Sequence, residues 1–221
     1  MIISAGRNEI FSFALPMGVG LVDMSINLTA LLQKRAMVDG GGRYEQNLAT
    51  NRQLDERPNL IDSLVLQSAK TSQNPDKILN SLPSEIIFIG SAGLYKEGDF
   101  FEIFESSVAA NIEISSLENK SYSPMESKIA SVVPRGTCKV NSSNFITTDQ
   151  NLARDLFDRG YFLENMEFFA VLKVAQKFQI PAYGIFVATN FCDKNAHADF
   201  ITNHEQAKKE LEKYLKQKEI I

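Results

Sequence analysis

Cysteine is scarce in this chain, which has only two, Cys138 and Cys192, among 221 residues. Two cysteines cannot build the disulfide framework of a small secreted domain, and these two lack the close spacing of metal ligands. We therefore expect both to be reduced thiols with a structural role. The sequence predicts neither a metal site nor a cofactor.

Long apolar runs and an excess of basic residues are also missing. No stretch of 18 apolar residues occurs, and the N-terminal MIISAGRNE lacks a basic region followed by an apolar segment. We therefore expect a soluble, cytoplasmic protein without a membrane partner. The net charge is −4 at pH 7, and lysine and arginine gather only near the C-terminus, between glutamates. Such a chain offers no basic surface for phosphate backbones, so nucleic acid is not an expected partner.

The chain does contain enough apolar material for one core, because 44% of its residues are hydrophobic. Strand-like runs alternate with helix-like patterns, which predicts a single α/β domain with a mixed, mostly parallel sheet between helices. Asp149 is expected to cap one of the helices. Strands are predicted at residues 9–15, 85–90, 161–165 and 181–190, with more in 100–114, and helices at 21–35, 59–70, 76–82, 149–159, 167–178 and 203–218.

The segment VDGGGRYEQNLATNRQLDERP, residues 38–58, has a different character from its surroundings. It contains three consecutive glycines, many amides and few apolar anchors. This composition is typical of a mobile surface excursion. We predict one domain, residues 1–221, with a flexible insertion at about 38–82 that is most sensitive to proteases around 38–58.

Glu167 lies inside one of the most apolar runs of the chain, ENMEFFAVLKVAQKF. On a helix it shares a stripe with Ala170, Val171, Val174 and Phe178, and that stripe should face the core. An ionised carboxylate without a partner is costly in an apolar site, so it either finds hydrogen-bond donors or gives up its charge. A polar group of the protein or of a ligand is therefore expected to meet Glu167.

Four short segments follow predicted strands or begin the next helix: GSAG, NSSNFI, ENME and ATN. In a parallel α/β sheet the ligand crevice lies outside the carboxyl ends of the strands, so these segments are expected around one opening. The turn MGVGLVD matches only half of a dinucleotide fingerprint, because Asp23 stands where the third glycine should be, and nicotinamide binding is not favoured. GSAG either lets backbone amides approach a ligand or is a tight strand-end turn without function.

Taken in order, FALPMGVG, IIFIGSAGLYKEGDF, KVNSSNFI and ENMEFFAVLKVAQKFQIPAYGIFVATN resemble the successive signatures of the purine nucleoside phosphorylase and nucleosidase superfamily. They are most similar to methylthioadenosine/S-adenosylhomocysteine nucleosidases, and the likeness covers about residues 1–35 and 83–218. The resemblance implies a three-layer α/β/α fold and cleavage of the N-glycosidic bond of a purine nucleoside. A homodimer or a higher homo-oligomer is expected.

The resemblance also implies roles for the substrate-binding residues. Met166 would pack on the ribose, and Glu167 would accept hydrogen bonds from the ribose hydroxyls, unless a neighbouring protein donor occupies it. Phe145 would lie against the base, unless it is a core aromatic that ends a strand. Backbone groups of Ile146 would read the edge of the base. The turn beside base and sugar would be formed by Ser91, Ala92 and Gly93.

The sequence departs from the family at the leaving group and at the phosphate. The family places an aspartate after the strand that follows the Met-Glu helix, and here Asn190 holds that catalytic position. An amide donates a hydrogen bond but cannot transfer a proton. Asp193 could replace the acid only if the loop turned back. Family phosphorylases hold phosphate with an arginine before the glycine turn, where this chain has Phe88 and Ile89, so the use of phosphate is left open.

The sequence shows even fewer groups that could activate the nucleophile. Family nucleosidases activate water with a glutamate in their first strand-and-loop unit, and this chain is predicted to begin after that unit. Arg7, Glu9, Arg43 and Arg135 could replace lost groups, but nothing in the sequence places them in the pocket.

Two hypotheses of different classes follow from these features. One is an enzyme, a purine nucleoside hydrolase or phosphorylase with altered catalytic groups. The other is a binding or structural protein that keeps the nucleoside pocket and has lost the chemistry. Retention of Glu167, Phe145 and GSAG favours at least ligand binding, whereas Asn190 and Phe88 argue against ordinary catalysis.

Overall fold

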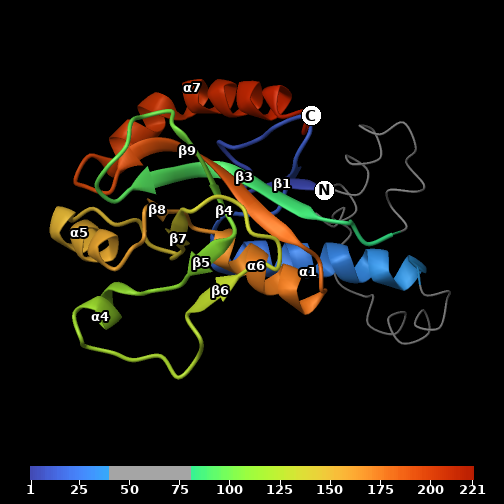
Figure 1. Ribbon diagram of the computed structural model, residues 1–221, viewed down its shortest axis with the longest axis horizontal. Coiled ribbons are helices and arrows are strands. Elements are labelled where there is room, and N and C mark those ends of the chain that lie inside the picture. Colours follow the sequence, from blue (N-terminus) through green and yellow to red (C-terminus); the bar gives the residue numbers. More distant parts are fainter. Residues whose placement is uncertain (40–80) are drawn as a thin grey trace, which may run out of the picture.

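The structure is a computed structural model that describes residues 1–39 and 81–221 (Figure 1). The strands are β1 (Ile2–Ser4), β2 (Leu15–Pro16), β3 (Ile86–Leu94), β4 (Ile103–Ser106), β5 (Val108–Ala110), β6 (Lys128–Ala130), β7 (Lys139–Asn141), β8 (Leu163–Glu164) and β9 (Ala182–Phe191). The helices are α1 (Gly20–Asp39), α4 (Ile114–Leu117), α5 (Gln150–Asp158), α6 (Phe168–Lys177) and α7 (Ala196–Gln217). No helix within the described ranges is both long and apolar enough to cross a membrane.

All nine strands of the described residues belong to one mixed sheet, as predicted. Its main path is β2-β1-β3-β8-β7-β5-β6, and β9 pairs with β3 and β4 outside that path. The centre is the parallel pair β3 and β9, which extends from Ile86 opposite Ala182 to Leu94 opposite Phe191 with one shift of register. β3 also pairs with β1 in parallel near its start and with β8 antiparallel near its end. The end of β3 therefore lies between β8 and β9.

Helices cover both faces of the sheet, which confirms the three-layer α/β/α prediction (Figure 1). On one face, Leu211 and Leu215 of α7 are fully buried in a cluster with Ile185 of β9. On the other face, Leu28 of α1 and Val171 of α6 are buried in a second cluster with central strand residues. Burying apolar side chains on both faces is the main source of stability in such a fold.

Two local predictions agree with the structure. Asp149 caps α5, because its side chain accepts hydrogen bonds from the backbone N–H groups of Asn151 (2.7 Å) and Leu152 (3.2 Å). The helix predicted at 21–35 is also present as α1, and its apolar residues Met24 and Leu28 have no exposed surface.

Residues 9–15 were predicted to form a strand, and this is wrong. Only Leu15 joins the sheet, in β2, while the preceding residues form a loop. The aromatic residues that gave the run its strand-like character pack elsewhere: Phe11 is buried, and Phe13 packs against the cluster beneath α7. These aromatic side chains are covered by packing against other side chains, without the backbone pairing of a strand.

The GSAG segment, residues 90–93, is not the strand-end turn that was predicted. It continues β3 to Leu94, because β9 supplies a paired backbone along its whole length. The register shifts between Ala92 and Gly93, which marks a β-bulge at this point. A bulge redirects the strand next to the site described below.

Most of the predicted insertion lies outside the described residues, and so do Arg43 and the predicted helix at 59–70. Of the predicted insertion, the structure describes only the two ends: residues 38–39, which belong to α1, and residues 81–82, which are not helical. The predicted helix at 76–82 is therefore not seen in its last two residues.

Candidate functional site

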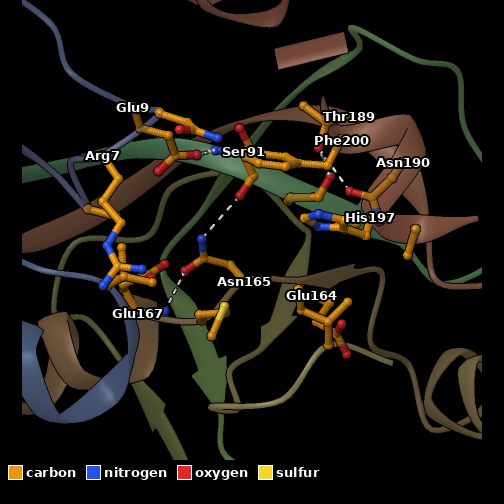
Figure 2. A pocket seen from close by; sticks show the side chains of 18 of the residues that line it. Arg7, Glu9, Ser91, Glu164, Asn165, Glu167, Thr189, Asn190, His197 and Phe200 are labelled. Atoms are coloured by element: carbon orange, nitrogen blue, oxygen red, sulfur yellow. Dashed lines mark hydrogen bonds between the residues drawn. The ribbon is translucent and has the colours of Figure 1, made fainter. Parts of the chain in front are cut away.

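A cavity of about 370 Å³ opens beside the ends of β3, β8 and β9, where the loop after β1 and the first turn of α7 meet (Figure 2). This is the carboxyl edge at which the sequence predicted a ligand crevice. It is lined by Ala5, Gly6, Arg7, Asn8, Glu9, Val19, Ser91, Ala92, Gly93, Ile146, Glu164, Asn165, Met166, Glu167, Thr189, Asn190, Ala196, His197 and Phe200.

Glu167 lies at the cavity wall immediately before α6, at the N-cap position and not within the helix. It is buried, and its Oε1 accepts a hydrogen bond from the backbone N–H of Gly20 (2.8 Å), at the first turn of α1. The polar partner that we expected for Glu167 is therefore, for its Oε1, an N–H group of the protein itself. Within the described residues the carboxylate is also approached by the side chain of Asn165 and the backbone of Met166. The hydrogen bond from Gly20 fixes Oε1, and the group lies at the cavity wall, where a ligand can donate to it.

Burial and, to a smaller extent, the nearby Glu9 carboxylate together raise the pKa of Glu167 to about 8, against the opposing hydrogen bond from Gly20. Desolvation outweighs hydrogen bonding here because the side chain is only 3% exposed. In the empty cavity at neutral pH, Glu167 is largely protonated.

Glu9 is brought into the same cavity by the loop that follows β1. Its Oε1 accepts a hydrogen bond from the backbone N–H of Ser91 in β3 (2.5 Å), and its own carbonyl accepts one from the Ser4 hydroxyl (2.8 Å). Burial raises the pKa of Glu9, and the hydrogen bonds from Ser91 oppose that shift. Sequence reasoning named Glu9 without placing it. The signal available was the short apolar strand IIS followed by the small residues Ala5 and Gly6.

Asn165 connects the two walls that carry these carboxylates. Its Oδ1 accepts hydrogen bonds from the backbone N–H groups of Glu167 and Phe168 (both 2.9 Å), and its Nδ2 donates to the carbonyl of Ser91 (3.1 Å). It thereby fixes the start of α6 against β3. Sequence reasoning missed this residue, although asparagine just before a helix is a capping signal.

Asn190 lies near the end of β9, at the other end of the cavity from Arg7 (Figure 2). Its Oδ1 accepts a hydrogen bond from the Thr189 hydroxyl (2.9 Å), and its Nδ2 donates to the carbonyl of Phe191 (3.1 Å). These two contacts orient the amide and leave the second N–H of Nδ2 for a ligand.

Gly93 makes room for that amide. It is paired with Asn190 on one side and with Glu164 on the other. A Cβ at this position would lie 2.9 Å from Nδ2 of Asn190 and 2.8 Å from Sγ of Cys192. Any side chain here would displace one of those groups.

Most of the predicted site residues are brought together. Seven of them line the cavity: Ser91, Ala92, Gly93, Ile146, Met166, Glu167 and Asn190. Phe145 does not, because its side chain is 70% exposed and lies outside the cavity wall, and it is not a core residue either. The loop does bring its neighbour Ile146 to the wall.

The remaining candidates are placed as follows. Arg7 lines the cavity, whereas Arg135 stacks over the Tyr183 ring at 4.7 Å from its centroid and is not part of the wall. Asp193 is outside the wall as well, because its side chain accepts hydrogen bonds from Asn195 N (2.7 Å) and Gln150 Nε2 (3.5 Å). It does not turn back to replace the missing acid.

Two further observations concern groups that the family uses. Phe88 and Ile89, which stand where phosphorylases have an arginine, are fully buried in the core. The described part of the chain contains no cluster of side chains suited to a metal ion.

Comparison with protein-family models and with curated proteins finds no match to this sequence. Solved structures do match. A futalosine hydrolase mutant from Helicobacter pylori strain 26695 has a TM-score of 0.62 at 14% identity, covering 97% of this chain and 95% of that chain. An aspartate-to-asparagine mutant of the methylthioadenosine/S-adenosylhomocysteine nucleosidase of Helicobacter pylori, with 5'-methylthioadenosine in its active site, has a TM-score of 0.63 at 14% identity, covering 98% and 95%.

The corresponding nucleosidase of Streptococcus pneumoniae, solved with a transition-state inhibitor, has a TM-score of 0.59 at 11% identity, with coverage of 97% and 95%. At these identities the likeness shows the fold alone, and this fold is the one that the sequence resemblance implied. The predicted start of this chain after the family's first strand-and-loop unit stays a prediction. The match spans 95% of the neighbour's chain, and β1 with its loop carries Glu9 to the cavity.

Proposed function

We propose that this protein hydrolyses the N-glycosidic bond of purine nucleosides. The observation that carries the proposal is the composition of one cavity, in which two buried carboxylates, Glu9 and Glu167, lie on the side away from the amide of Asn190 (Figure 2). Glycosidic cleavage needs a nucleophile on one side of the anomeric carbon and a hydrogen-bond donor to the leaving base on the other. The nucleosidases and the hydrolase that share the fold support this choice.

The sugar is assigned to the side of Glu167 and Met166. Oε2 of Glu167 would bind the ribose hydroxyls, while Oε1 keeps its hydrogen bond from the Gly20 N–H. The base is assigned to the side of Asn190, with Ile146 against its edge. This orientation gives both Glu167 and Asn190 a partner of matching chemistry.

Glu9 is assigned the activation of water. It is held by the N–H of Ser91, and its raised pKa brings it closer to the neutral range in which a carboxylate is an effective general base. In the proposed step the water oxygen bonds to the anomeric carbon, and the carbon–nitrogen bond breaks with its electron pair moving to the base. The water proton passes to Glu9. A hydrogen bond from Asn190 stabilises the departing base, which then takes a proton from solvent.

Hydrolysis is favoured over phosphorolysis because the backbone N–H of Ser91 is already engaged within the protein. Small residues at the end of a buried strand offer backbone N–H groups that could hold an anion. Here that donor already binds the Glu9 carboxylate, which would repel a phosphate at the same place. In addition, Phe88 and Ile89 supply no cationic group.

The second candidate function is nucleoside binding without cleavage. Asn190 supports it, because an amide cannot protonate the base. The general acid that is missing here typically contributes about 10²–10⁴-fold in rate. Asn190 is also fixed by Thr189 and Phe191 as a stable part of the wall. The homo-oligomer expected from the sequence stays a prediction in either case.

A panel of nucleosides distinguishes the two functions. Inosine, guanosine, adenosine and methylthioadenosine are incubated with the protein, with and without phosphate, and released base is measured by chromatography. We expect cleavage without phosphate, a drop of about 10²–10⁴-fold in kcat for Glu9→Gln, and no change for the exposed control Glu126→Gln. Binding of nucleosides with no cleavage by wild type would favour the second candidate. Absence of both binding and cleavage would refute the nucleoside assignment.

A further inference from the structure

Arg7 occupies an unusual backbone position at the edge of the cavity. It lies in the tight turn between Gly6 and Glu9, which is closed by a hydrogen bond from the N–H of Glu9 to the carbonyl of Gly6 (3.0 Å). Its φ is +54°, in the left-handed region that residues with a Cβ rarely adopt. Non-glycine residues held in this region are often found at functional sites.

The turn is held in place from both sides. Ala5 accepts a hydrogen bond from the N–H of Gly18 (2.9 Å), and the Ser4 hydroxyl donates to the carbonyl of Glu9 (2.8 Å). A Cβ on Gly6 would lie 2.9 Å from the Cβ of Pro16, so the turn packs closely against β2. The backbone that carries Arg7 is therefore preorganised, and its side chain extends along the cavity wall (Figure 2).

The positive charge of Arg7 is not used inside the described part of the protein. The two carboxylates of the same wall have other donors, because Glu9 is bound by Ser91 and Glu167 by Gly20. Within residues 1–39 and 81–221, Arg7 makes no hydrogen bond or ion pair. It is exposed at the cavity, so a ligand can reach its guanidinium.

The place of Arg7 indicates which part of a ligand it would meet. Figure 2 shows Arg7 and Glu167 on one side of the cavity and Asn190 and His197 on the other. In the orientation proposed above, the base lies by Asn190 and the sugar by Glu167. Arg7 then lies beyond the sugar as seen from the base.

We propose that Arg7 forms an anion subsite for a carboxylate or phosphate group attached to the sugar, so that the substrates are anionic nucleoside derivatives. The inference rests on the proposed function, since that function sets the orientation of the nucleoside. A guanidinium binds carboxylate and phosphate oxygens through paired, charge-assisted hydrogen bonds. An attached anion fits better than free phosphate, because the Ser91 amide that could help to hold free phosphate already binds Glu9.

Isothermal calorimetry on the full chain tests this subsite. The probes are inosine and inosine 5'-monophosphate, adenosine and its 5'-monophosphate and 5'-carboxylate, and inorganic phosphate added with inosine. The variants are Arg7→Gln and the control Arg159→Gln, which removes the same charge from an exposed position after α5. Because salt screens exposed charges, each titration is made at low and at high ionic strength.

We expect wild type and Arg159→Gln to bind the anionic derivatives about tenfold or more tightly than the parent nucleosides at low salt. In Arg7→Gln this preference disappears, while the affinity for uncharged inosine and adenosine is kept. If uncharged nucleosides bind and the anionic ones bind no more tightly, the subsite is refuted and the proposed function stands. If inorganic phosphate binds beside inosine through Arg7, the anion is free and the attached-anion proposal is wrong. If no nucleoside or derivative binds, the proposed function itself fails.

Discussion

Glu164 accepts two hydrogen bonds from Thr147, one from its backbone N–H (2.8 Å) and one from its hydroxyl. The Tyr95 hydroxyl donates a third (3.1 Å), so this buried carboxylate is well supplied with donors. Thr147 follows Ile146, which lines the base side of the cavity. A carboxylate in β8 thereby fixes the loop on which the base is proposed to rest.

Thr147→Val should weaken binding of the free purine base by about 1 kcal/mol or more, because it removes the hydroxyl donor and loosens the loop at Ile146. Calorimetry with hypoxanthine and adenine measures the change. Thr202→Val is the matched control, since the Thr202 hydroxyl donates to the carbonyl of Ala198 within its own helix (2.9 Å). Unchanged base affinity in Thr147→Val would show that the loop is held without this contact.

Glu167→Ala should weaken nucleoside binding by roughly 1–3 kcal/mol, with little effect on binding of the free base. The physical reason is the loss of the carboxyl group that is assigned to the ribose hydroxyls and is held at the cavity wall by the N–H of Gly20. Calorimetry with inosine and adenosine, each beside its free base, gives the two affinities. Equal losses for nucleoside and base would rule out the ribose assignment.

Glu167 should also make stability depend on pH. Its pKa is raised from 4.5 to about 8 by burial, so the folded chain holds a proton that the unfolded chain releases between these values. This contribution to stability is complete at low pH and is lost as pH rises toward 8. Burial also raises the pKa values of Glu9 and Glu164, which adds to the same trend.

The measurement is urea unfolding of wild type and Glu167→Gln at pH 5.5 and pH 8. Glutamine keeps an oxygen for the Gly20 N–H and does not titrate. Between pH 5.5 and pH 8 the free energy of unfolding of wild type should fall by about 2–3 kcal/mol more than that of the variant. Parallel pH curves for the two proteins would show that Glu167 titrates near its ordinary pKa.

Gly93→Ala should disturb the base side of the cavity. The added methyl group meets Asn190 Nδ2 at 2.9 Å and Cys192 Sγ at 2.8 Å, so we expect a loss of about 1–3 kcal/mol in stability and weaker base binding. Adding Cys192→Ala makes room on one side only. The double variant should regain stability by thermal unfolding but not base affinity, because Asn190 stays displaced. Recovery of both together would remove Asn190 from the base site.

The parts of the fold that sequence could predict are those set by local pattern. Asp149 at a helix start, the apolar spacing on α1 and the run that forms β9 each specify their element within a few residues. Residues 9–15 were misread because their aromatic side chains resemble a strand while packing beneath α7. GSAG was misread because its strand conformation depends on pairing with β9, about ninety residues later in the chain.

The candidate site also contains residues that could be predicted from the sequence and residues that could not. Glu167 could be singled out because a charge inside an apolar run is visible in the sequence, whereas Met166 was named through the Met-Glu pair of the family resemblance. Glu9 could not be placed, since its position depends on the short strand β1 pairing with β3 across a long separation. Glu164 and Asn165 were missed because their partners, Thr147 and Ser91, are distant in sequence.

The last prediction concerns Asn190 and the choice of base. Its Oδ1 is occupied by Thr189, and one N–H of Nδ2 by Phe191, so the other N–H is the donor left for the purine. The remaining N–H can donate to the purine N7 or to the O6 of a 6-oxopurine, whereas the 6-amino group of adenine is itself a donor. Wild type should therefore bind hypoxanthine or guanine at least as well as adenine.

Asn190→Asp changes this donor into a group that can carry a proton. The variant is compared with wild type for release of base from inosine, guanosine and adenosine, with and without phosphate. If the amide limits the reaction, Asn190→Asp should speed cleavage, by up to about 10²-fold, because a general acid then assists departure of the base. Its preference should move toward adenosine. Rapid, strictly phosphate-dependent cleavage of adenosine by wild type would contradict both the base preference and the assignment of water as the nucleophile.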